Sequence, residues 1–588
     1  MIFSQRLRRN TVKIEGERSS ALDLARGRLA LMSGFFILVY MVFAVRAFDL
    51  AIIQGRAIAP DNGQNAENNI PNINGETPRR ADITDRNGAL LATTLKTASL
   101  YADPHLVADA DAAAKKLVKI FPDLKYGDVL QKLQSHKRFV WLQRNVSPDQ
   151  QYQVLQIGEP GLEFEEGYKR FYPQGALTAH LLGYGNVDAQ GLAGIERSFN
   201  KHLSAGHDLK LTLDIRLQHV LRREMLKAVG EFEAIGAAGA IMDVTTGEIL
   251  AGVSLPDFNP HDPGHADKDA IFNRLTLGAY ELGSVFKIFS TAAFFEVHDV
   301  PMSTTFDASE PIKIGRHTIH DYHAKERILT IPEVFMYSSN IGSALMGRAV
   351  GTDALRSFYH DLGLLDPLDF EVREVARPLV PHPWREVNTL TASYGHGVST
   401  TPLQLVTAVS SIVNGGYLVK PSLVLDEQSD EEESGEDIRI VSAKTAQRIR
   451  QLLRLVVTDG TAKKAEVKGY RVGGKTGTAE KIVDGRYDSK KKISSFVGVF
   501  PMDEPRYAVF IMVDEPKGQK HTWNYATGGW VAAPAVARVV ASMASILGIS
   551  PAGDNTPENH FGESLKQFVS TVSTSPPLGE GIEGRGRE

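Results

Sequence analysis

The chain has 588 residues, of which 43% are hydrophobic and 23% charged, so it is long and apolar enough for several globular domains. It has 65 Lys and Arg against 70 Asp and Glu, a formal net charge of −5, and so lacks the basic excess of a protein that coats nucleic acid. The sequence contains no cysteine, which excludes disulfides, thiolate metal sites and cysteine nucleophiles. We therefore expect no nucleic-acid partner.

An uncharged apolar run near the N-terminus predicts a membrane anchor. It lies between Arg28 and Arg46, and as a helix it would span about 25 Å, close to the hydrocarbon thickness of a bilayer. Basic residues are frequent before the run and sparse after it, which places the N-terminus in the cytoplasm. A cleavable signal peptide is disfavoured because Arg46 interrupts the expected small-residue cleavage site. We predict a single-pass protein of the inner membrane.

The remaining segments predict a mixed α+β protein. Residues 54–78 are polar and rich in Asn, Gly and Pro, as in a linker, and 85–88 (DRNG) form a hairpin-type turn signal. A helix is expected from Asp214, because apolar residues follow it at helical spacing. Strands are expected at AAGAIMDV, EILAGVSL, SFVGVF and YAVFIMV. The acidic run 426–437 reads as a solvated loop, and the Gly-, Pro- and Ser-rich end of the chain reads as disordered.

Three short motifs contain residues suited to nucleophilic chemistry. In the first, Ser284 and Lys287 are three residues apart, so a helix would place hydroxyl and amine on one face within hydrogen-bond reach. The second, Ser338-Ser339-Asn340, interrupts an apolar helical stretch. The third, Lys475-Thr476-Gly477-Thr478, follows two glycines that permit close approach of a ligand to the backbone. Each motif is weak alone, but S-x-x-K, S-x-N and K-T-G in this order are the signature of penicillin-binding proteins and class A β-lactamases.

The chain therefore resembles the class B penicillin-binding proteins, the membrane-anchored transpeptidases of the bacterial cell wall. The similarity extends from about residue 79 to residue 548 and includes RRADITDRNGALLA (79–92), WLQR (141–144) and RFYPQGALTAHLLGYGNVDAQGLAGIE (170–196), which look like the family's pedestal motifs. The K-T-G-T-A spelling and the length look most like the division-specific, septal branch. Leu282 is a departure, because the family usually has proline before Gly283.

The resemblance implies a penicillin-binding transpeptidase domain of serine β-lactamase-like fold, with an elongated N-terminal pedestal and one transmembrane helix. The predicted organisation is a cytoplasmic tail (1–28), a transmembrane anchor (29–50), a linker (54–78), a pedestal or dimerisation-type domain (79–206), a transpeptidase domain (207–548) and a disordered tail (549–588).

The resemblance also implies the roles of the motif residues. Ser284 would be the nucleophile and Lys287 its base, with a pKa lowered by burial and by a second cation, Lys475. Ser338 would relay a proton, and Asn340 would orient Lys287 and the substrate amide. Lys475, Thr476 and Thr478 of the K-T-G-T segment, which includes Gly477, would hold the terminal carboxylate of the substrate, and the backbone N–H groups of Ser284 and Thr478 would form the oxyanion hole.

We expect no cofactor and no metal. The expected partners are peptidoglycan stem peptides, β-lactams, the membrane, a glycan-polymerising protein and other division proteins.

Several alternatives remain. Residues 469–476 match the G-x-x-x-x-G-K-T phosphate-binding loop, but such a loop must open a helix, and the following sequence disfavours one. His317, His320 and His323 invite a metal site, although strand geometry would point His320 away from the other two. An elongation-type transpeptidase, a hydrolase such as a β-lactamase or carboxypeptidase, and a non-catalytic β-lactam sensor or division scaffold are further possibilities.

Overall fold

The computed structural model describes residues 79–315, 317–425, 438–483, 485–551 and 563–569, together with Met32, Tyr40 and Met41. The predicted linker (54–78) and acidic loop (426–437) lie outside these residues, and so does nearly all of the predicted anchor (29–50). In the described part of the chain, no helix is both long and apolar enough to cross a membrane. The chain divides into two compact units, 1–77 and 78–588, and the elements below belong to the second.

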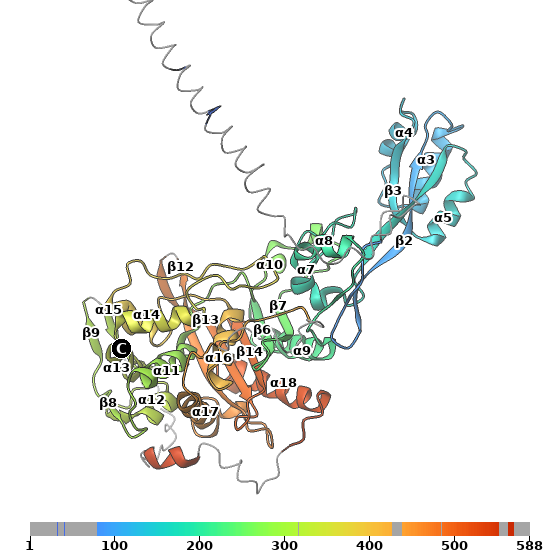
Figure 1. Cartoon of the computed structure of the whole chain (residues 1–588). Helices are drawn as coiled ribbons and strands as arrows, with labels where there is room; N and C mark the ends of the chain where they lie inside the picture. The colour runs from blue at the N-terminus through green and yellow to red at the C-terminus, as the bar shows by residue number, and fades with distance from the viewer. Residues whose placement is uncertain are drawn as a thin grey trace, which may run out of the picture. The chain divides into compact units, whose positions relative to one another are not determined.

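The first part of this unit contains a small mixed sheet (Figure 1). Its strands are ordered β3-β2-β1-β5, and β4 also pairs with β2. The predicted turn at 85–88 is confirmed: Gly88 N–H donates to the Asp85 carbonyl at 3.0 Å, and β1 pairs antiparallel with β2. The elements here are β1 (Ile83–Thr84), β2 (Leu90–Ala102), α3 (Ala110–Ile120), α4 (Tyr126–Leu133), β3 (Val140–Val146), α5 (Pro148–Leu155), β4 (Leu162–Phe171) and β5 (Leu209–Lys210).

Helices α3, α4 and α5 pack with β2, β3 and β4 around their own hydrophobic core. Leu100, Leu117 and Leu133 are buried in this cluster, which is separate from the larger core of the chain. The two largest apolar clusters of the described residues therefore belong one to this region and one mainly to the later domain, beside two small ones.

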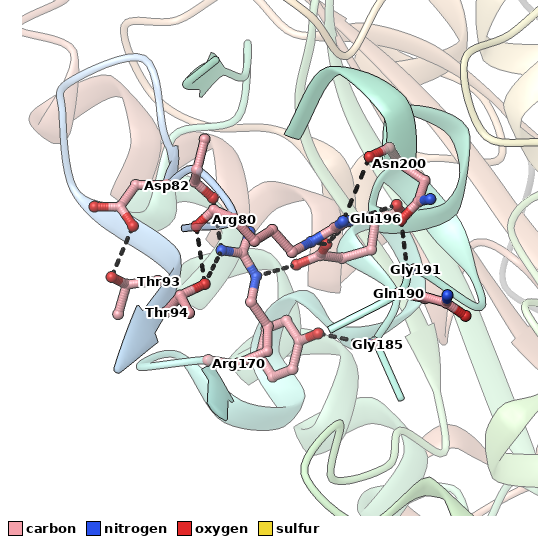
Figure 2. Close-up of polar contacts among 12 residues, drawn as sticks. Arg80, Asp82, Thr93, Thr94, Arg170, Gly185, Gln190, Gly191, Glu196 and Asn200 are labelled. Atoms are coloured by element: carbon pink, nitrogen blue, oxygen red, sulfur yellow. Dashed lines mark hydrogen bonds and ion pairs between the residues drawn. The ribbon is translucent and has the colours of Figure 1, made fainter. Parts of the chain in front are cut away.

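A buried charge cluster ties together three segments that are distant in sequence (Figure 2). Arg80 Nε donates to Glu196 Oε2 at 2.8 Å, and Arg170 Nε donates to Glu196 Oε1 at 2.6 Å. Arg80 also donates to Asn200 Oδ1 at 2.8 Å, and all three ionic side chains are almost completely shielded from solvent. The segments 79–92 and 170–196 therefore meet in one cluster, which joins the segment before β1 to the end of β4 and to α7 (Gly194–Ser198).

The later domain is built on a five-stranded antiparallel sheet in the order β12-β13-β14-β6-β7 (Figure 1). All four predicted strand segments lie in it, in β6 (Gly236–Asp243), β7 (Ile249–Leu255), β13 (Arg486–Phe500) and β14 (Tyr507–Asp514), whereas β12 (Gly473–Val483) forms one edge. The expected helix is α9 (Ile215–Glu231), and the Asp214 carboxylate caps it by accepting from Arg216 N–H. The domain is therefore mixed α and β, as expected.

Helices cover both faces of this sheet. Gly239 on β6 faces α9, because a Cβ there would meet Leu221 and Met225, and the side chain of Met242 on the same strand meets Ser410 of α16 (Pro402–Val413). Residues three apart on a strand point to opposite faces, so α9 and α16 cover opposite sides. Helix α18 (Ala532–Ile546) packs beside α9 on the sheet.

The remaining elements connect these layers. The helices are α6 (Ala179–Leu182), α8 (Asn200–Ser204), α10 (Lys268–Ile271), α11 (Lys287–Val297), α12 (Ile331–Tyr337), α13 (Asn340–Val350), α14 (Thr352–Asp361), α15 (Glu386–Ala392) and α17 (Ala443–Thr458). The short strands are β8 (Thr305–Asp307), β9 (Ile312–Ile314), β10 (His317–Ile319) and β11 (Ile328–Thr330), and the 3-10 helices are η2 (Gly175–Thr178), η3 (Pro263–His265), η4 (Gly283–Phe286), η5 (Lys463–Ala465), η6 (Lys520–Thr522) and η8 (Glu563–Phe568).

The prediction that all of 549–588 is disordered is wrong for η8. Leu565 is buried in the main core, and Thr330 Oγ1 donates to the Phe568 carbonyl at 2.8 Å. The average composition of the tail concealed these apolar residues, and burying them stabilises a short helical turn against the domain.

Candidate active site

Ser284 lies where the chain enters the first helix of the predicted site. It belongs to η4, which continues directly into α11, as expected for a residue at a helix start. Gly283 has a left-handed φ of +56°, and a Cβ there would lie 2.8 Å from the Thr478 carbonyl oxygen. Both the left-handed backbone and the lack of space for a side chain therefore require glycine at this position. Ser284 is half-buried and lines a cavity of about 680 Å³.

Lys287 lies on α11 with its side chain fully buried, and its amine contacts the second motif. Lys287 Nζ donates to Asn340 Oδ1 at 2.8 Å, to Ser338 Oγ at 3.1 Å and to the Ser338 carbonyl. No hydrogen bond joins Lys287 to Ser284, and Ser284 Oγ has no hydrogen-bond partner among the described residues. The i,i+3 spacing places both residues on one face, but the Ser338–Asn340 segment holds the lysine amine.

The geometry of Ser338 explains how one residue contacts Lys287 twice. Ser338 ends α12 in the left-handed region, with φ 61° and ψ 42°. A non-glycine residue in this conformation costs about 1–3 kcal/mol, and such strain concentrates at functional sites. Here it lets both the carbonyl and the hydroxyl of Ser338 accept from Lys287 Nζ.

Asp321, which the motifs did not identify, anchors the second motif. Its carboxylate accepts from Ser339 Oγ at 2.7 Å, from Ile341 N–H at 2.9 Å and from Asn340 N–H. It thus satisfies the free N–H groups at the start of α13 with a negative charge. Asn340 Nδ2 in turn donates to the His320 carbonyl at 2.9 Å. The histidine-containing stretch therefore serves this site through a backbone carbonyl and through Asp321.

The third motif lies on β12, the edge strand of the main sheet. Lys475 is fully buried, and its Nζ donates to Ser338 Oγ at 2.8 Å. A Cβ at Gly477 would lie 2.4 Å from the Leu282 carbonyl oxygen, so this glycine lets β12 approach the segment before Ser284. Because β12 continues to Val483, Lys475 and Thr476 do not open a helix, and the phosphate-loop interpretation is excluded.

Two threonines of the third motif face the cavity. Thr476 Oγ1 and Thr461 Oγ1 are 2.9 Å apart, and Thr478 Oγ1 accepts from Gly528 N–H at 3.1 Å. An edge strand beside a cavity can pair with an extended peptide, because its outer backbone groups have no strand partner.

The two lysines are poised for proton transfer. Burial, then the charge of Lys475, holds the pKa of Lys287 well below its ordinary value, whereas the Asp321 carboxylate raises the pKa of Lys287. Burial alone lowers the pKa of Lys475 to about 7. Ser338 Oγ lies between the two amines, at 3.1 Å from Lys287 Nζ and 2.8 Å from Lys475 Nζ. A neutral amine is thus available near neutral pH beside a hydroxyl able to pass a proton.

His396 also lines the cavity and was not singled out from the sequence. Its ring packs against Tyr394 and Tyr487, with centroids 5.1 Å and 5.7 Å away, and burial lowers its pKa to about 4. Gly283 N–H donates to the Gly395 carbonyl at 3.3 Å, which holds this loop beside the serine. The sequence offers one indication that His396 belongs to the site, its position within the stretch 392–405 that resembles the family.

All the predicted site residues thus converge on one site. Ser284, Ser338, Asn340, Thr476 and Thr478 line the cavity, Lys287 and Lys475 reach Ser338 from buried positions, and Gly477 permits the contact between β12 and the segment before Ser284.

Comparison with known proteins gives two family matches. Residues 237–541 match the penicillin binding protein transpeptidase domain, and residues 75–211 match the penicillin-binding protein dimerisation domain. The chain therefore belongs to the penicillin-binding proteins, and the pairing of these two domains makes it a class B member.

Individual relatives agree with this assignment. The chain is 35% identical over 579 residues to the probable peptidoglycan D,D-transpeptidase FtsI of Caulobacter vibrioides, covering 93% of this chain and 95% of the relative. It is 30% identical to the peptidoglycan D,D-transpeptidase FtsI of Escherichia coli K12, covering 80% and 84%. Among solved structures, penicillin binding protein 3 of Mycobacterium tuberculosis complexed with aztreonam aligns with a TM-score of 0.65 and 25% identity, covering 81% of this chain and 98% of that one.

Proposed function

We propose that this chain is a serine-type peptidoglycan D,D-transpeptidase that cross-links stem peptides through an acyl-enzyme on Ser284. The observation that carries the proposal is the position of Ser338 Oγ between the amines of Lys287 and Lys475, on the cavity that Ser284 lines. The family membership and the names of the relatives support the same activity.

In the first half-reaction, Ser284 Oγ attacks the carbonyl of the penultimate D-Ala of a donor stem peptide. Its proton passes to the neutral amine of Lys287, and Ser338 carries a proton toward the departing amine. The C–N bond to the terminal D-Ala breaks, leaving an ester on Ser284. The backbone N–H groups of Ser284 and Thr478 stabilise the oxyanion, and Lys475, Thr476 and Thr478 hold the terminal carboxylate before it leaves.

In the second half-reaction, an amine of a neighbouring stem attacks the ester. The amine loses a proton through the same groups, Ser284 Oγ recovers one, and a new amide forms the cross-link. Asn340 Oδ1 keeps the Lys287 amine in place at 2.8 Å. β-Lactams resemble the donor and would acylate the same hydroxyl.

The biological setting is part of the same proposal. The two FtsI relatives, together with the K-T-G-T-A segment, favour a role in septal wall synthesis during cell division over an elongation role. The basic N-terminus and the apolar run that follows it favour a single-pass inner-membrane anchor with the catalytic domain outside the cytoplasm. The region before residue 207 is a candidate docking surface for a glycan-polymerising protein and other division proteins. Imaging a tagged chain in dividing cells tests the septal role, since an elongation enzyme would label the lateral wall.

The activity is tested with the full-length chain, a donor stem peptide ending in D-Ala-D-Ala and an amine acceptor. We expect released D-Ala and a cross-linked product from the wild type and neither from Ser284→Ala. Release of D-Ala without cross-linking would indicate a hydrolase, and a β-lactam adduct without either product would indicate a sensor or scaffold.

A further inference from the structure

Four lysines line the same cavity as Ser284 but take no part in the proposed reaction. They are Lys325, Lys463, Lys464 and Lys492, which we call the lysine rim. Lys325 precedes β11, Lys463 and Lys464 lie in η5, and Lys492 lies in β13. Lys463 and Lys464 are exposed, and the other two are half-buried. Three segments far apart in the sequence thus bring positive charge to one opening.

Aromatic rings hold three of these ammonium groups in place. Lys464 Nζ lies 4.1 Å from the centroid of Trp530, Lys325 Nζ lies 4.6 Å from that of Tyr337, and Lys492 Nζ lies 6.0 Å from that of Tyr322. All three rings line the cavity as well. A ring face attracts a cation through its quadrupole but brings no negative charge, so each ammonium is positioned without being neutralised.

Carboxylates of the cavity balance the charge of the rim only in part. None of the four lysines forms an ion pair with any residue that the structure describes. Two carboxylates line the cavity, those of Asp321 and Glu480. Asp321 accepts from Ser339 Oγ and two backbone N–H groups of α13, and Glu480 lies opposite Lys492 on the neighbouring strand. Four lysines against two carboxylates leave an excess of positive charge. An excess of charge of one sign around a concave site attracts ligands of the opposite sign and discriminates against neutral ones.

We propose that the lysine rim recognises carboxylates that an acidic stem peptide carries ahead of its terminal D-Ala-D-Ala. This inference rests on the proposed function and specifies its substrate. The terminal carboxylate is assigned to Lys475, Thr476 and Thr478, so the rim acts on a different part of the same peptide. The lysines are positioning residues for the donor, because they take no part in bond making or breaking.

The test compares an acidic pentapeptide stem with the same peptide after amidation of its internal carboxylates. Each competes with a fluorescent penicillin for the full-length chain, in the wild type and in the double variants K463Q/K464Q and K325Q/K492Q. K116Q/K119Q is the matched control, because it removes two exposed lysines of α3 that do not line the cavity.

We expect the wild type to bind the acidic peptide about tenfold more tightly than the amidated one. Each rim variant should lose most of this preference, whereas the control should keep it. The rate at which penicillin alone acylates each variant is the reference for its own competition. Raising the salt concentration from about 50 mM to about 500 mM should weaken binding of the acidic peptide to the wild type and have little effect on its binding to the rim variants.

The outcomes separate this inference from the proposed function. A wild type that penicillin does not label would overturn the proposed function, and the inference with it. A labelled wild type without preference for the acidic peptide, or rim variants that retain the preference, would overturn the inference alone. Equal competition by an anionic polysaccharide that carries no peptide would make the rim a general polyanion site and would also contradict it.

Discussion

Asp321 has two separable effects at the active site, one through its hydrogen bonds and one through its charge. As an acceptor it fixes the first turn of α13 and therefore the position of Asn340. As an anion it raises the pKa of Lys287, against the lowering caused by burial and by Lys475. Because asparagine retains an acceptor oxygen but has no charge, Asp321→Asn can distinguish the two effects.

We predict that Asp321→Asn moves the acidic limb of the pH profile of β-lactam acylation to lower pH. Removing the anion removes the interaction that raises the pKa of Lys287, so the lysine is deprotonated at lower pH than in the wild type. The measurement is the second-order acylation rate as a function of pH, since the profile of this rate reports the pKa values of the free enzyme's acid and base. Asp321→Ala is the companion variant, and it should also lose about 1 kcal/mol of stability because the N–H groups of Asn340 and Ile341 at the start of α13 lose their acceptor.

Lys475→Gln should have the opposite effect on the same profile. The charge of Lys475 lowers the pKa of Lys287, so its loss raises that pKa and moves the acidic limb to higher pH. A shift in the same direction for Lys475→Gln and Asp321→Asn would contradict the assignment of Lys287 as the group that titrates.

Many single residues of the site could be predicted from the sequence, because the three motifs contain the residues with reactive groups. The sequence did not indicate Asp321, since its partners, the Ser339 hydroxyl and two backbone N–H groups, lie about twenty residues later in the chain. The spacing predicted that Ser284 and Lys287 share a face, but the hydrogen-bond partners of Lys287 could not be predicted, because helical spacing does not specify which of several acceptors a long side chain reaches.

At the scale of elements, the site depends on the close approach of β12 to η4. Gly477 lies where a Cβ would be 2.4 Å from both the Leu282 carbonyl oxygen and Ser495 Oγ. The edge strand and the nucleophile segment thus contact each other through backbone. Leu282, where the family usually has proline, is fully buried at φ −95°, which is outside the usual range of a proline ring.

We predict that Gly477→Ala lowers the acylation rate about 100-fold, because the methyl group displaces β12 from η4 and with it Lys475 and Thr478. Thermal stability should fall by about 1–3 kcal/mol, as is typical of overpacking. Gly230→Ala in α9 is the matched control, because a Cβ there meets no atom within 4 Å, and it should leave acylation unchanged. A wild-type rate of acylation in the Gly477→Ala variant would show that the tight contact between β12 and η4 is not required.

The elements themselves were largely predictable. The strands of the main sheet are apolar runs, and α9 begins at a capping Asp214. The pairing order β12-β13-β14-β6-β7 was not predictable, because it joins strands more than two hundred residues apart. The lysine rim was not predictable from the sequence for the same reason, since its members lie on three separate segments.

At the scale of the whole described molecule, Arg80, Arg170 and Glu196 link the beginning and the end of the region before residue 207 (Figure 2). The resemblance indicated the segments 79–92 and 170–196, but their mutual contact through one carboxylate depends on the fold. Both arginines would remain buried without an anion if Glu196 lost its charge.

We predict that Glu196→Gln destabilises the protein by about 3–5 kcal/mol, the usual effect of breaking a buried ion pair. The readout is the thermal unfolding midpoint of the full-length chain. At a temperature where the variant is folded, acylation should stay within about twofold of wild type, because the cluster lies outside the active-site cavity. A variant with unchanged stability would indicate that the two arginines gain other partners, contrary to this account.

The most direct measurement is to map the residue that penicillin modifies in the full-length chain. The protein is labelled with a fluorescent penicillin, digested, and the adduct located by mass spectrometry. We expect a single long-lived adduct on the peptide that contains Ser284, absent from Ser284→Ala. An adduct on any other residue, or an equally labelled Ser284→Ala variant, would contradict it.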